Sequence, residues 1–331
     1  MKTVRFNSHG DPAEVLAVED AEMPVPGPGE VRVRMLASPI NPADLMFVRG
    51  SYGKRPALPA TPGFEGVGVV EDGRGLLARF LKGKRVSVLN RERGNWSEHT
   101  IVRAKQAIPL DKSLSVEQAA CFFVNPATAY AMTRSVLKVP NGEWLLQSAA
   151  GSALGRMVVR LGQHYGFRTL NIVRRESQVQ QLKSLGGDEV LVFDGDEDSF
   201  VEAVREIIPG GAKYAIDAVG GTTGSAIVRS LGFGARMLVY GTLSGEPLSF
   251  SSRTLMTTAA RLDGFWLSNH MSGLYLPAKL GMVRNIAHLA KSGVLTSDIT
   301  QVFELSDIQT AVVAADSPGR SGKVVLQIGR D

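Results

Sequence analysis

Hydrophobic and polar positions follow two different patterns along the 331-residue chain. In the first 120 residues, short runs such as 31–36, 67–70 and 85–88 are strand-like, and 31–36 alternates apolar with basic side chains, as an antiparallel strand with one wet face should. From residue 125 onward, continuous apolar runs alternate with segments of helical periodicity, which predicts a parallel sheet covered by helices. The predicted strands are 143–148, 168–173, 189–193, 213–218, 235–241 and 264–268, and the predicted helices include 156–165, 177–185, 199–208 and 277–291.

These patterns predict an α/β chain with two domains. Residues 123–268 are expected to form a doubly wound nucleotide-binding domain. This domain is inserted into a compact β-barrel domain of residues 1–122 and 269–331, which the strand at 322–326 is expected to rejoin. A chain of this length is long enough to bury two cores.

A turn of small residues joins the strand at 143–148 to the helix at 156–165. Such a turn lets a pyrophosphate approach backbone N–H groups and the positive end of the helix dipole. The pattern G-x-G-x-x-G is only partly present, because its first two glycines are replaced by alanine and serine. A tight turn that binds nothing is the alternative. The candidate cofactor-binding residues in the turn are Ala150, Ser152, Ala153, Leu154 and Gly155.

A pair of arginines favours a cofactor-binding turn over a turn that binds nothing. Arg174 and Arg175 lie at the end of the second strand, 19 and 20 positions after Gly155, where an NAD site usually has an acidic residue for the ribose hydroxyls. Guanidinium groups suit the 2′-phosphate of NADP instead. A solvated basic turn is the alternative, but the combination of turn, helix and arginines favours NADPH as the cofactor.

Composition narrows the class of protein. Hydrophobic residues make up 44% of the chain and charged residues 21%, as in an ordinary globular protein. The net charge of +5 is dispersed, so no nucleic-acid partner is expected. No apolar run is long enough to span a bilayer, so no membrane partner is expected either. Cys121 is the single cysteine, which together with the absence of a visible signal peptide suggests a cytoplasmic protein.

Four short blocks stand out along the chain: Asn41-Pro42-Ala43-Asp44, Pro62-Gly63-Phe64-Glu65-Gly66, Asn125-Pro126-Ala127-Thr128 and Gly264-Phe265-Trp266-Leu267-Ser268. With these blocks, the chain resembles the medium-chain dehydrogenase/reductase superfamily over essentially its whole length. Within that superfamily, it is similar to the zinc-free 2-enoyl thioester reductases, and part of the similarity is shared with quinone reductases. The resemblance implies a GroES-like β-barrel catalytic domain, a Rossmann domain and a homodimer paired near residues 265–268.

The residues present do not suit the zinc of related alcohol dehydrogenases. A structural zinc would need four cysteines, and only Cys121 is available. Where the family's Gly-His-Glu supplies an imidazole, this chain has Gly63-Phe64-Glu65, and phenylalanine cannot bind a metal. The five histidines are scattered. No metal is therefore expected.

The resemblance also implies roles for individual residues. Tyr52 is expected to donate the proton in catalysis, since a tyrosine hydroxyl with its ordinary pKa of about 10 is protonated at neutral pH. A ring that only packs against a loop is the alternative. Asn41 is the second candidate catalytic residue. The remaining candidates are cofactor-binding residues: Asn125, Thr128, Tyr240, Gly241, Thr242, Phe265, Trp266, Ser268 and Lys323.

Several of these candidates have simpler interpretations. Asn125 could cap a helix that starts at Pro126. Phe265 and its neighbours could form sheet core or a dimer edge, and Lys323 could be a surface lysine.

The resulting prediction is NADPH-dependent reduction of the C2=C3 double bond of a 2-enoyl thioester carried by CoA or an acyl-carrier protein. Hydride would reach the β-carbon and a proton the α-carbon, while the protein stabilises the charge on the thioester oxygen. An NADPH:quinone reductase is the main alternative. A non-catalytic NADPH-binding protein is a further one.

Overall fold

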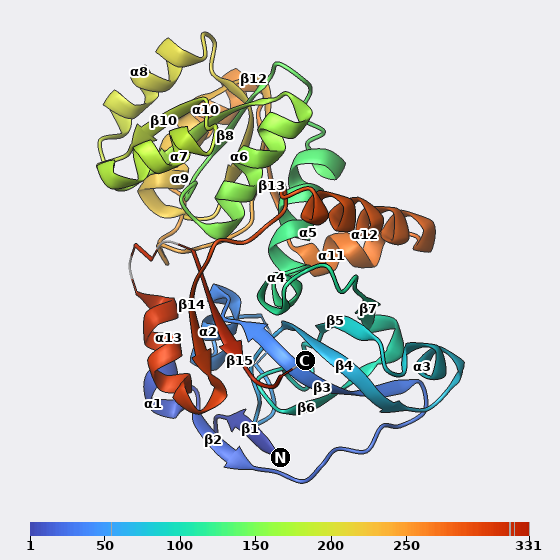
Figure 1. Ribbon diagram of the computed structural model, residues 1–331. Coiled ribbons are helices and arrows are strands. Elements are labelled where there is room, and N and C mark those ends of the chain that lie inside the picture. The colour runs from blue at the N-terminus through green and yellow to red at the C-terminus, as the bar shows by residue number, and fades with distance from the viewer. Residues whose placement is uncertain (54, 318, 321, 331) are drawn as a thin grey trace. The chain divides into compact units, whose positions relative to one another are not determined.

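The computed structural model describes residues 1–53, 55–317, 319–320 and 322–330. The chain forms two compact units, Met1–Val124 with Ser297–Asp331, and Asn125–Thr296 (Figure 1). Residues 269–296, predicted to lie in the β-barrel domain, thus group with the nucleotide-binding unit. Two hydrogen bonds within that unit help to hold them: Asn285 Nδ2 donates to the Tyr130 hydroxyl over 2.8 Å, and Arg160 Nη1 donates to the Thr296 carbonyl over 3.0 Å.

The first unit is built on a seven-stranded sheet with the order β14-β15-β3-β4-β5-β7, and β6 also pairs with β3. Every pairing is antiparallel except that of β14 with β15. A separate antiparallel pair joins β1 and β2. The strands are β1 (Lys2–Arg5), β2 (Ala17–Asp20), β3 (Glu30–Pro39), β4 (Glu65–Gly73), β5 (Arg85–Leu89), β6 (His99–Arg103), β7 (Ala107–Pro109), β14 (Ile299–Glu304) and β15 (Lys323–Gln327).

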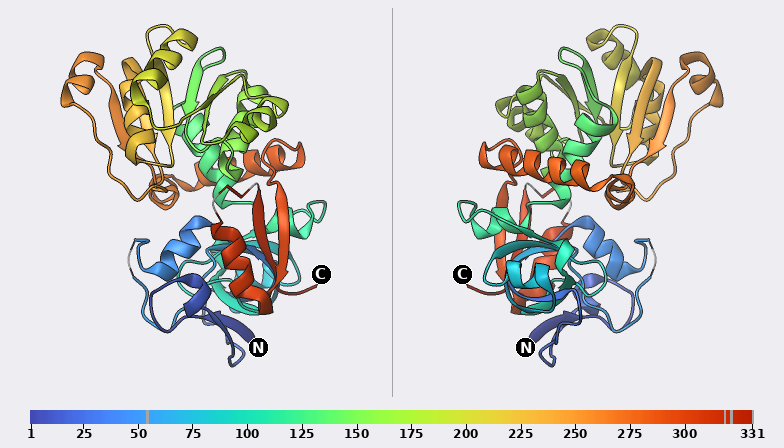
Figure 2. Two further views of the ribbon diagram at one scale, coloured as in Figure 1. Left: turned by 90° about the vertical axis from the view of Figure 1, so that its left-hand side faces the viewer. Right: turned by 90° about the vertical axis from the view of Figure 1, so that its right-hand side faces the viewer.

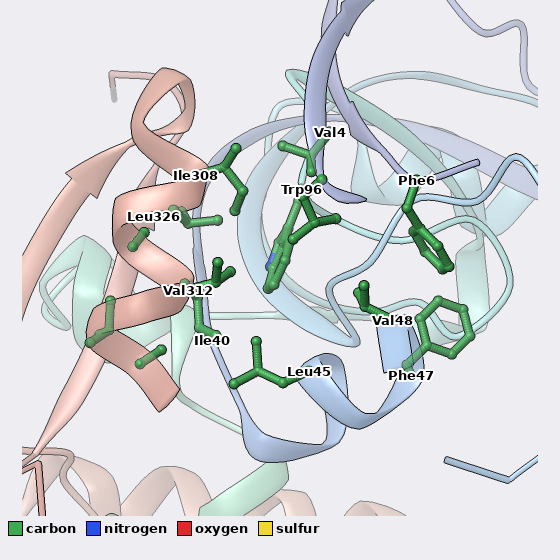
Figure 3. Packing of buried hydrophobic residues seen from close by; sticks show 14 of the residues in the cluster. Val4, Phe6, Ile40, Leu45, Phe47, Val48, Trp96, Ile308, Val312 and Leu326 are labelled. Atoms are coloured by element: carbon green, nitrogen blue, oxygen red, sulfur yellow. The ribbon is translucent and has the colours of Figure 1, made fainter. Parts of the chain in front are cut away.

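The largest core of this unit lies between helices and the sheet. Trp96 has no exposed surface and is surrounded by apolar residues from the N-terminal strand, α2, α13 and β15 (Figure 3). This packing fixes the final strand in the first unit, as predicted for 322–326. The helices are α1 (Pro12–Val15), α2 (Pro42–Arg49), α3 (Leu76–Leu81), η1 (Ala104–Gln106), α4 (Val116–Ala120), η4 (Leu305–Asp307) and α13 (Ile308–Asp316).

The second unit contains a six-stranded parallel sheet with the order β10-β9-β8-β11-β12-β13. The strand order reverses between β8 and β11, which is the switch point at which ligands bind in open α/β sheets. The strands are β8 (Trp144–Gln147), β9 (Arg168–Val173), β10 (Glu189–Val192), β11 (Ala212–Asp217), β12 (Leu231–Val239) and β13 (Arg261–Gly264).

Helices cover both faces of this sheet, α6 and α7 on one face and α8 and α9 on the other (Figure 2). The predicted doubly wound α/β arrangement is therefore confirmed.

Among the described residues, no helix combines the length and the apolar character needed to cross a membrane. The helices are α5 (Val124–Tyr130), η2 (Ala131–Val136), α6 (Ala153–Tyr165), η3 (Glu176–Gln178), α7 (Val179–Ser184), α8 (Glu197–Ile207), α9 (Gly221–Arg229), α10 (Ser252–Thr258), α11 (Leu267–Gly273) and α12 (Leu276–Lys291).

The prediction of a strand at 264–268 is wrong. The strand ends at Gly264, where its pairing with Val239 of β12 ends, and α11 begins at Leu267. A short apolar run fits a buried strand and a helix start equally well, so the periodicity could not distinguish them. The observed strand begins at Arg261, three residues before the predicted start. The ion pair of Arg236 Nε with Asp263 Oδ2, 2.7 Å long, joins this strand to β12.

Candidate active site

The turn between β8 and α6 has the local structure of an anion-binding helix start. Ser152 is the N-cap of α6, and its Oγ accepts a hydrogen bond from the Gly155 N–H over 3.0 Å. The N–H groups of Ala153 and Leu154 have no acceptor among the described residues. Two unpaired donors at the positive end of the α6 dipole can bind a phosphate oxygen.

Gly155 allows the helix to approach the strand closely. A Cβ at this position would lie 2.5 Å from the carbonyl oxygen of Ala150, and Ala150 itself is fully buried. Only glycine fits without displacing the backbone of the turn. The last glycine of the predicted fingerprint is therefore required by packing, whether or not a ligand is bound.

The ends of β8 and β11 are joined at the switch point by Ser148 and Asp217, both fully buried. Ser148 Oγ donates to Asp217 Oδ1 over 2.5 Å and accepts from the Ala218 N–H over 2.9 Å. The Asp217 carboxylate also accepts from the N–H groups of Val219 and Gly220, over 3.0 and 2.9 Å. One carboxylate thus orders the two loops that border the carboxyl edge of the sheet.

Tyr240 follows β12 at the same edge. Its hydroxyl is buried and has no hydrogen-bond partner among the described residues, and burial raises its pKa. A buried polar atom without a partner is rare in native proteins. Together with the free N–H groups of Ala153 and Leu154, it provides polar atoms for a dinucleotide, so this edge fits the cofactor. Gly241 is half-buried and Thr242 is exposed beside it.

Arg174 and Arg175 are exposed directly after β9. The 3₁₀ helix η3 follows them and brings the chain close to the small-residue turn again. A Cβ built on Gly151 in that turn would lie only 2.3 Å from Nε2 of Gln178 in η3. Arg156 adds a third guanidinium: its Nε donates to the Gly151 carbonyl over 3.3 Å and its Nη2 to Gln181 Oε1 over 2.7 Å. The basic loop and the turn therefore lie side by side.

The first unit contains a buried polar network centred on Asn41. The Asn41 amide nitrogen donates to Glu65 Oε1 over 3.0 Å, and its Oδ1 accepts from Lys323 Nζ. Glu65 Oε2 accepts from the Val124 N–H over 2.8 Å, at the first residue of α5. Asn41 and Lys323, predicted separately, are thus in contact. Lys323 is 1% exposed, so the interpretation of a surface lysine is wrong.

Asp44 completes this network from the first turn of α2. Its carboxylate accepts from the Asn41 N–H over 2.8 Å and from the Phe64 N–H over 2.9 Å. Burial raises the pKa of Asp44 to about 7 and also raises the pKa of Glu65, while it lowers the pKa of Lys323. The mutual attraction of Lys323 and the two carboxyl groups opposes each of these shifts.

Tyr52 lies on the loop after α2, two residues beyond the left-handed Gly50 that ends the helix. It is partly buried, and its ring centroid is 5.2 Å from that of Phe64. The guanidinium carbon of Arg91 lies 5.8 Å from the centres of both rings. The ring packing considered as an alternative is present, and it holds the tyrosine beside the segment that carries Glu65.

The other predicted residues have mixed outcomes. Helix α5 begins at Val124, so the prediction that Asn125 caps a helix starting at Pro126 is wrong. A proline is tolerated there because the first helical N–H groups lack intrahelical partners. Thr128 is buried within α5. Phe265 is buried, Ser268 is half-buried, and Trp266 is 42% exposed at the start of α11.

Comparisons with known proteins support the same fold. The family model of the alcohol dehydrogenase GroES-like domain matches residues 27–112, and that of the zinc-binding dehydrogenases matches residues 153–277. A Caenorhabditis elegans protein named mitochondrial enoyl-[acyl-carrier-protein] reductase is 30% identical, covering 99% of this chain and 97% of its own. The chain belongs to the medium-chain dehydrogenase/reductase superfamily. It is an oxidoreductase of that superfamily.

Two solved structures extend the comparison across this superfamily. A putative NADPH:quinone reductase from Bacillus thuringiensis has a TM-score of 0.91 and 31% identity, covering 98% of each chain. A structure titled as the complex of Etr1p with NADP and crotonyl-CoA has a TM-score of 0.86 and 25% identity, covering 98% of this chain and 99% of the other. Both branches identified from the sequence are therefore represented among the neighbours.

The dehydrogenase model's description raises the question of zinc. Within the part of the chain that the structure describes, no group of three or more His, Cys, Asp or Glu residues could hold a metal ion. Phe64, at the position of the family's histidine, packs its ring against Phe47 and Tyr52. Zinc independence stays a prediction from these residues.

Sequence reasoning missed several residues that organise this superfamily fold. Asp217 ends a buried strand at the carboxyl edge of the sheet, and this position could have identified it. Gln178 and Arg156 gave no local signal. Glu65 was noticed only as part of a missing zinc motif, and its hydrogen bond to Asn41 spans 24 positions. Pairing at such separations depends on how the strands are arranged.

Proposed function

We propose that the chain reduces the C2=C3 double bond of 2-enoyl thioesters with NADPH. The observation that carries the proposal is similarity over nearly the full length to a protein named enoyl-[acyl-carrier-protein] reductase and to a structure containing NADP and crotonyl-CoA. The geometry of the turn between β8 and α6 supports the cofactor, and the assignment of Tyr52 as the proton donor rests on the resemblance to the 2-enoyl thioester reductases.

The cofactor would be held by residues of the second unit. The N–H groups of Ala153 and Leu154 would bind the pyrophosphate, and Arg174 with Arg175 would bind the 2′-phosphate. The buried hydroxyl of Tyr240 would gain its missing partner. Bound NADPH would supply the hydride that reduces the β-carbon.

Tyr52 would deliver the proton to the α-carbon through its hydroxyl. Both polar atoms of the Asn41 amide are already hydrogen-bonded, to Glu65 and Lys323. We therefore assign Asn41 a positioning role in place of direct catalysis: it starts α2, and Tyr52 follows the end of that helix. Lys323, which contacts Asn41 in the interior, is assigned the same positioning role in place of cofactor binding.

An NADPH:quinone reductase is the second candidate, favoured by the structural neighbour with that title. Such an enzyme uses the same cofactor but needs no proton-donating tyrosine. The two functions can be separated by following NADPH oxidation with crotonyl-CoA, a longer trans-2-enoyl-CoA and a simple quinone. Turnover of the thioesters well above that of the quinone supports the proposal, and turnover of the quinone alone contradicts it.

Replacing Tyr52 by phenylalanine tests the proton donor. Enoyl reduction should fall at least about 100-fold, as expected for loss of general-acid catalysis, while any quinone reduction persists. Tyr275→Phe is the matched control, because Tyr275 is 72% exposed. Equal enoyl reduction by the wild type and Tyr52→Phe would remove Tyr52 from the mechanism.

Equilibrium binding of NADP⁺ and NAD⁺ tests the arginines. The double variant Arg174→Ala with Arg175→Ala should weaken NADP⁺ binding strongly and leave NAD⁺ binding nearly unchanged. Arg205→Ala, at an exposed arginine on α8, serves as the control. Equal losses for both nucleotides would contradict recognition of the 2′-phosphate.

We also propose a homodimer. The edge strand of the second sheet is β13, Arg261–Gly264, so pairing would use this strand in place of the predicted 265–268. An unpaired sheet edge is a natural site for pairing with another chain. Light scattering on the purified protein should give twice the chain mass, and a monomer across the accessible concentration range would refute the dimer.

A further inference from the structure

The connection between β4 and β5 presents apolar side chains to the outside. In α3, Ala78 and Leu81 are 2% and 1% exposed and pack into the core beneath the sheet. Three large apolar side chains of the same connection point away from that core: Leu76, Leu77 and Phe80 are 85%, 47% and 63% exposed. We call these three side chains the α3 apolar tip. Helix α3 lies at the periphery of the first unit, at the opposite end from α1 and α13 (Figure 1).

The apolar tip is surrounded by positive charge. Residues 74–91 contain no acidic residue, and Lys84 Nζ lies 3.1 Å from the centre of the Phe80 ring. Two more cations, Arg103 and Lys105, come from β6 and η1 beside a surface hollow of about 420 Å³ that Leu76 and Leu77 also line. The cations around the tip are Arg74, Arg79, Lys82, Lys84, Arg103 and Lys105.

Little of this charge is neutralised. In the described parts of the chain, Arg103 has an ion pair, with Glu92 at 3.9 Å, but no ion pair involves Arg74, Arg79, Lys82, Lys84 or Lys105. Glu30 also lines the hollow, where its carboxylate pairs with Arg93 at 3.1 Å and accepts the Gly27 N–H. The surface around the tip therefore has a positive potential.

We propose that the α3 tip attaches the protein to an anionic phospholipid surface. Leucine and phenylalanine would enter the boundary between headgroups and acyl chains, while the lysines and arginines contact lipid phosphates. This surface attachment needs no spanning helix, so the lack of an apolar run long enough to span a bilayer does not argue against it. The attachment is independent of which acceptor the enzyme reduces.

The shape of the patch favours a lipid over a protein partner. A stable protein interface of standard size uses about 20–30 residues a side, with an apolar core that fits a matching surface. The α3 tip has three adjacent apolar side chains and a ring of cations, which is sufficient for a few side chains to insert beneath a charged plane. Charge complementarity with anionic headgroups does not require a shaped groove.

Sedimentation with lipid vesicles tests the proposal on the full chain. Vesicles of phosphatidylcholine with phosphatidylglycerol should pellet the protein, and vesicles of phosphatidylcholine alone should not. Raising the sodium chloride concentration should release it, because cations near an anionic surface act through a screened potential. Inorganic phosphate at equal ionic strength should release it no better than chloride, and stronger release would indicate a site for free phosphate instead.

Two variants locate the contact. Leu76→Ser with Leu77→Ser and Phe80→Ser removes the apolar tip, and Arg79→Gln with Lys82→Gln removes two cations. Each cation should contribute about fivefold to the partition coefficient, so the charge variant should bind roughly 25-fold more weakly. Matched controls are Met256→Ser, at a methionine that is 80% exposed, and Lys183→Gln with Lys213→Gln. All variants should keep the wild-type melting temperature.

The outcomes are distinct. If the wild type stays in solution with anionic vesicles, or if both α3 variants pellet as it does, the proposal is wrong. If vesicles do not bind but an acidic acyl-carrier protein does, and the α3 variants lose that binding, the surface recognises a protein and the lipid assignment is overturned. If the wild type binds anionic vesicles and the α3 variants lose that binding while their enoyl reduction is unchanged, the proposal is supported. That result also separates it from the proposed function.

Discussion

Replacing Lys323 by methionine should destabilise the first unit strongly. The lysine is 1% exposed, its ammonium donates to Asn41 Oδ1, and its charge faces the carboxyl groups of Glu65 and Asp44. Methionine keeps most of the aliphatic stem, so the variant removes the charge and the donor with little loss of packing.

The magnitude follows from two consequences. Asn41 Oδ1 is left buried without its donor, which costs about 1–3 kcal/mol. Two buried carboxyl groups also lose their cation, and breaking a buried pair in this way costs about 3–5 kcal/mol in all. The loss should be largest at pH 8. At pH 5 the loss should be smaller, because the Asp44 carboxyl, with its pKa raised to about 7, is then protonated and no longer loses an attraction to the ammonium.

Urea unfolding followed by tryptophan fluorescence measures this loss. Trp96 is fully buried in the first unit, so a background with Trp144→Phe and Trp266→Phe reports on that unit alone. Lys112→Met, at an exposed lysine, should change the free energy of unfolding by less than about 0.5 kcal/mol. Adding Glu65→Gln to Lys323→Met should recover part of the loss. A Lys323→Met loss below about 0.5 kcal/mol at pH 8, or an equal loss at both pH values, would refute the reasoning.

Three further predictions concern other groups. Because the pKa of Asp44 is raised, the folded state binds more protons than the unfolded state between about pH 4 and 7. The free energy of unfolding should therefore fall as the pH rises through that range. Asp44→Asn should make the urea midpoint depend less steeply on pH. Gly155→Ala should lower the melting temperature, because the clash with Ala150 costs about 1–3 kcal/mol of folding free energy. Gly281→Ala, which has open space around it in α12, should stabilise the protein by about 0.5–1 kcal/mol. Equal effects of the two substitutions would contradict the packing argument. Asp217→Asn removes a charged acceptor and should cost about 1.5–3 kcal/mol while weakening NADP⁺ binding in calorimetry; unchanged binding would show that the loops keep their order without the carboxylate.

Local periodicity was sufficient for much of the second unit. The predicted strand at 168–173 coincides with β9, and the predicted helix at 277–291 begins one residue later than α12. Both segments have strong apolar patterns and clear ends, because glycine follows or precedes them where the chain turns. The small-residue turn and the basic pair after β9 were readable for the same reason: they are contiguous in the chain.

The sequence by itself therefore determined the alternation of strands and helices in much of the second unit, its doubly wound class and the position of the small-residue turn. Only the tertiary structure decided which distant groups meet: Lys323 reaches Asn41 across 282 positions, and Ser148 reaches Asp217 across 69. It also decided that the strand ends at Gly264, and that Leu76, Leu77 and Phe80 of α3 are exposed while Ala78 and Leu81 are buried. Periodicity describes one element and its neighbours, whereas the partner of a buried charge and the exposure of a short helix depend on how the sheets bring remote segments together.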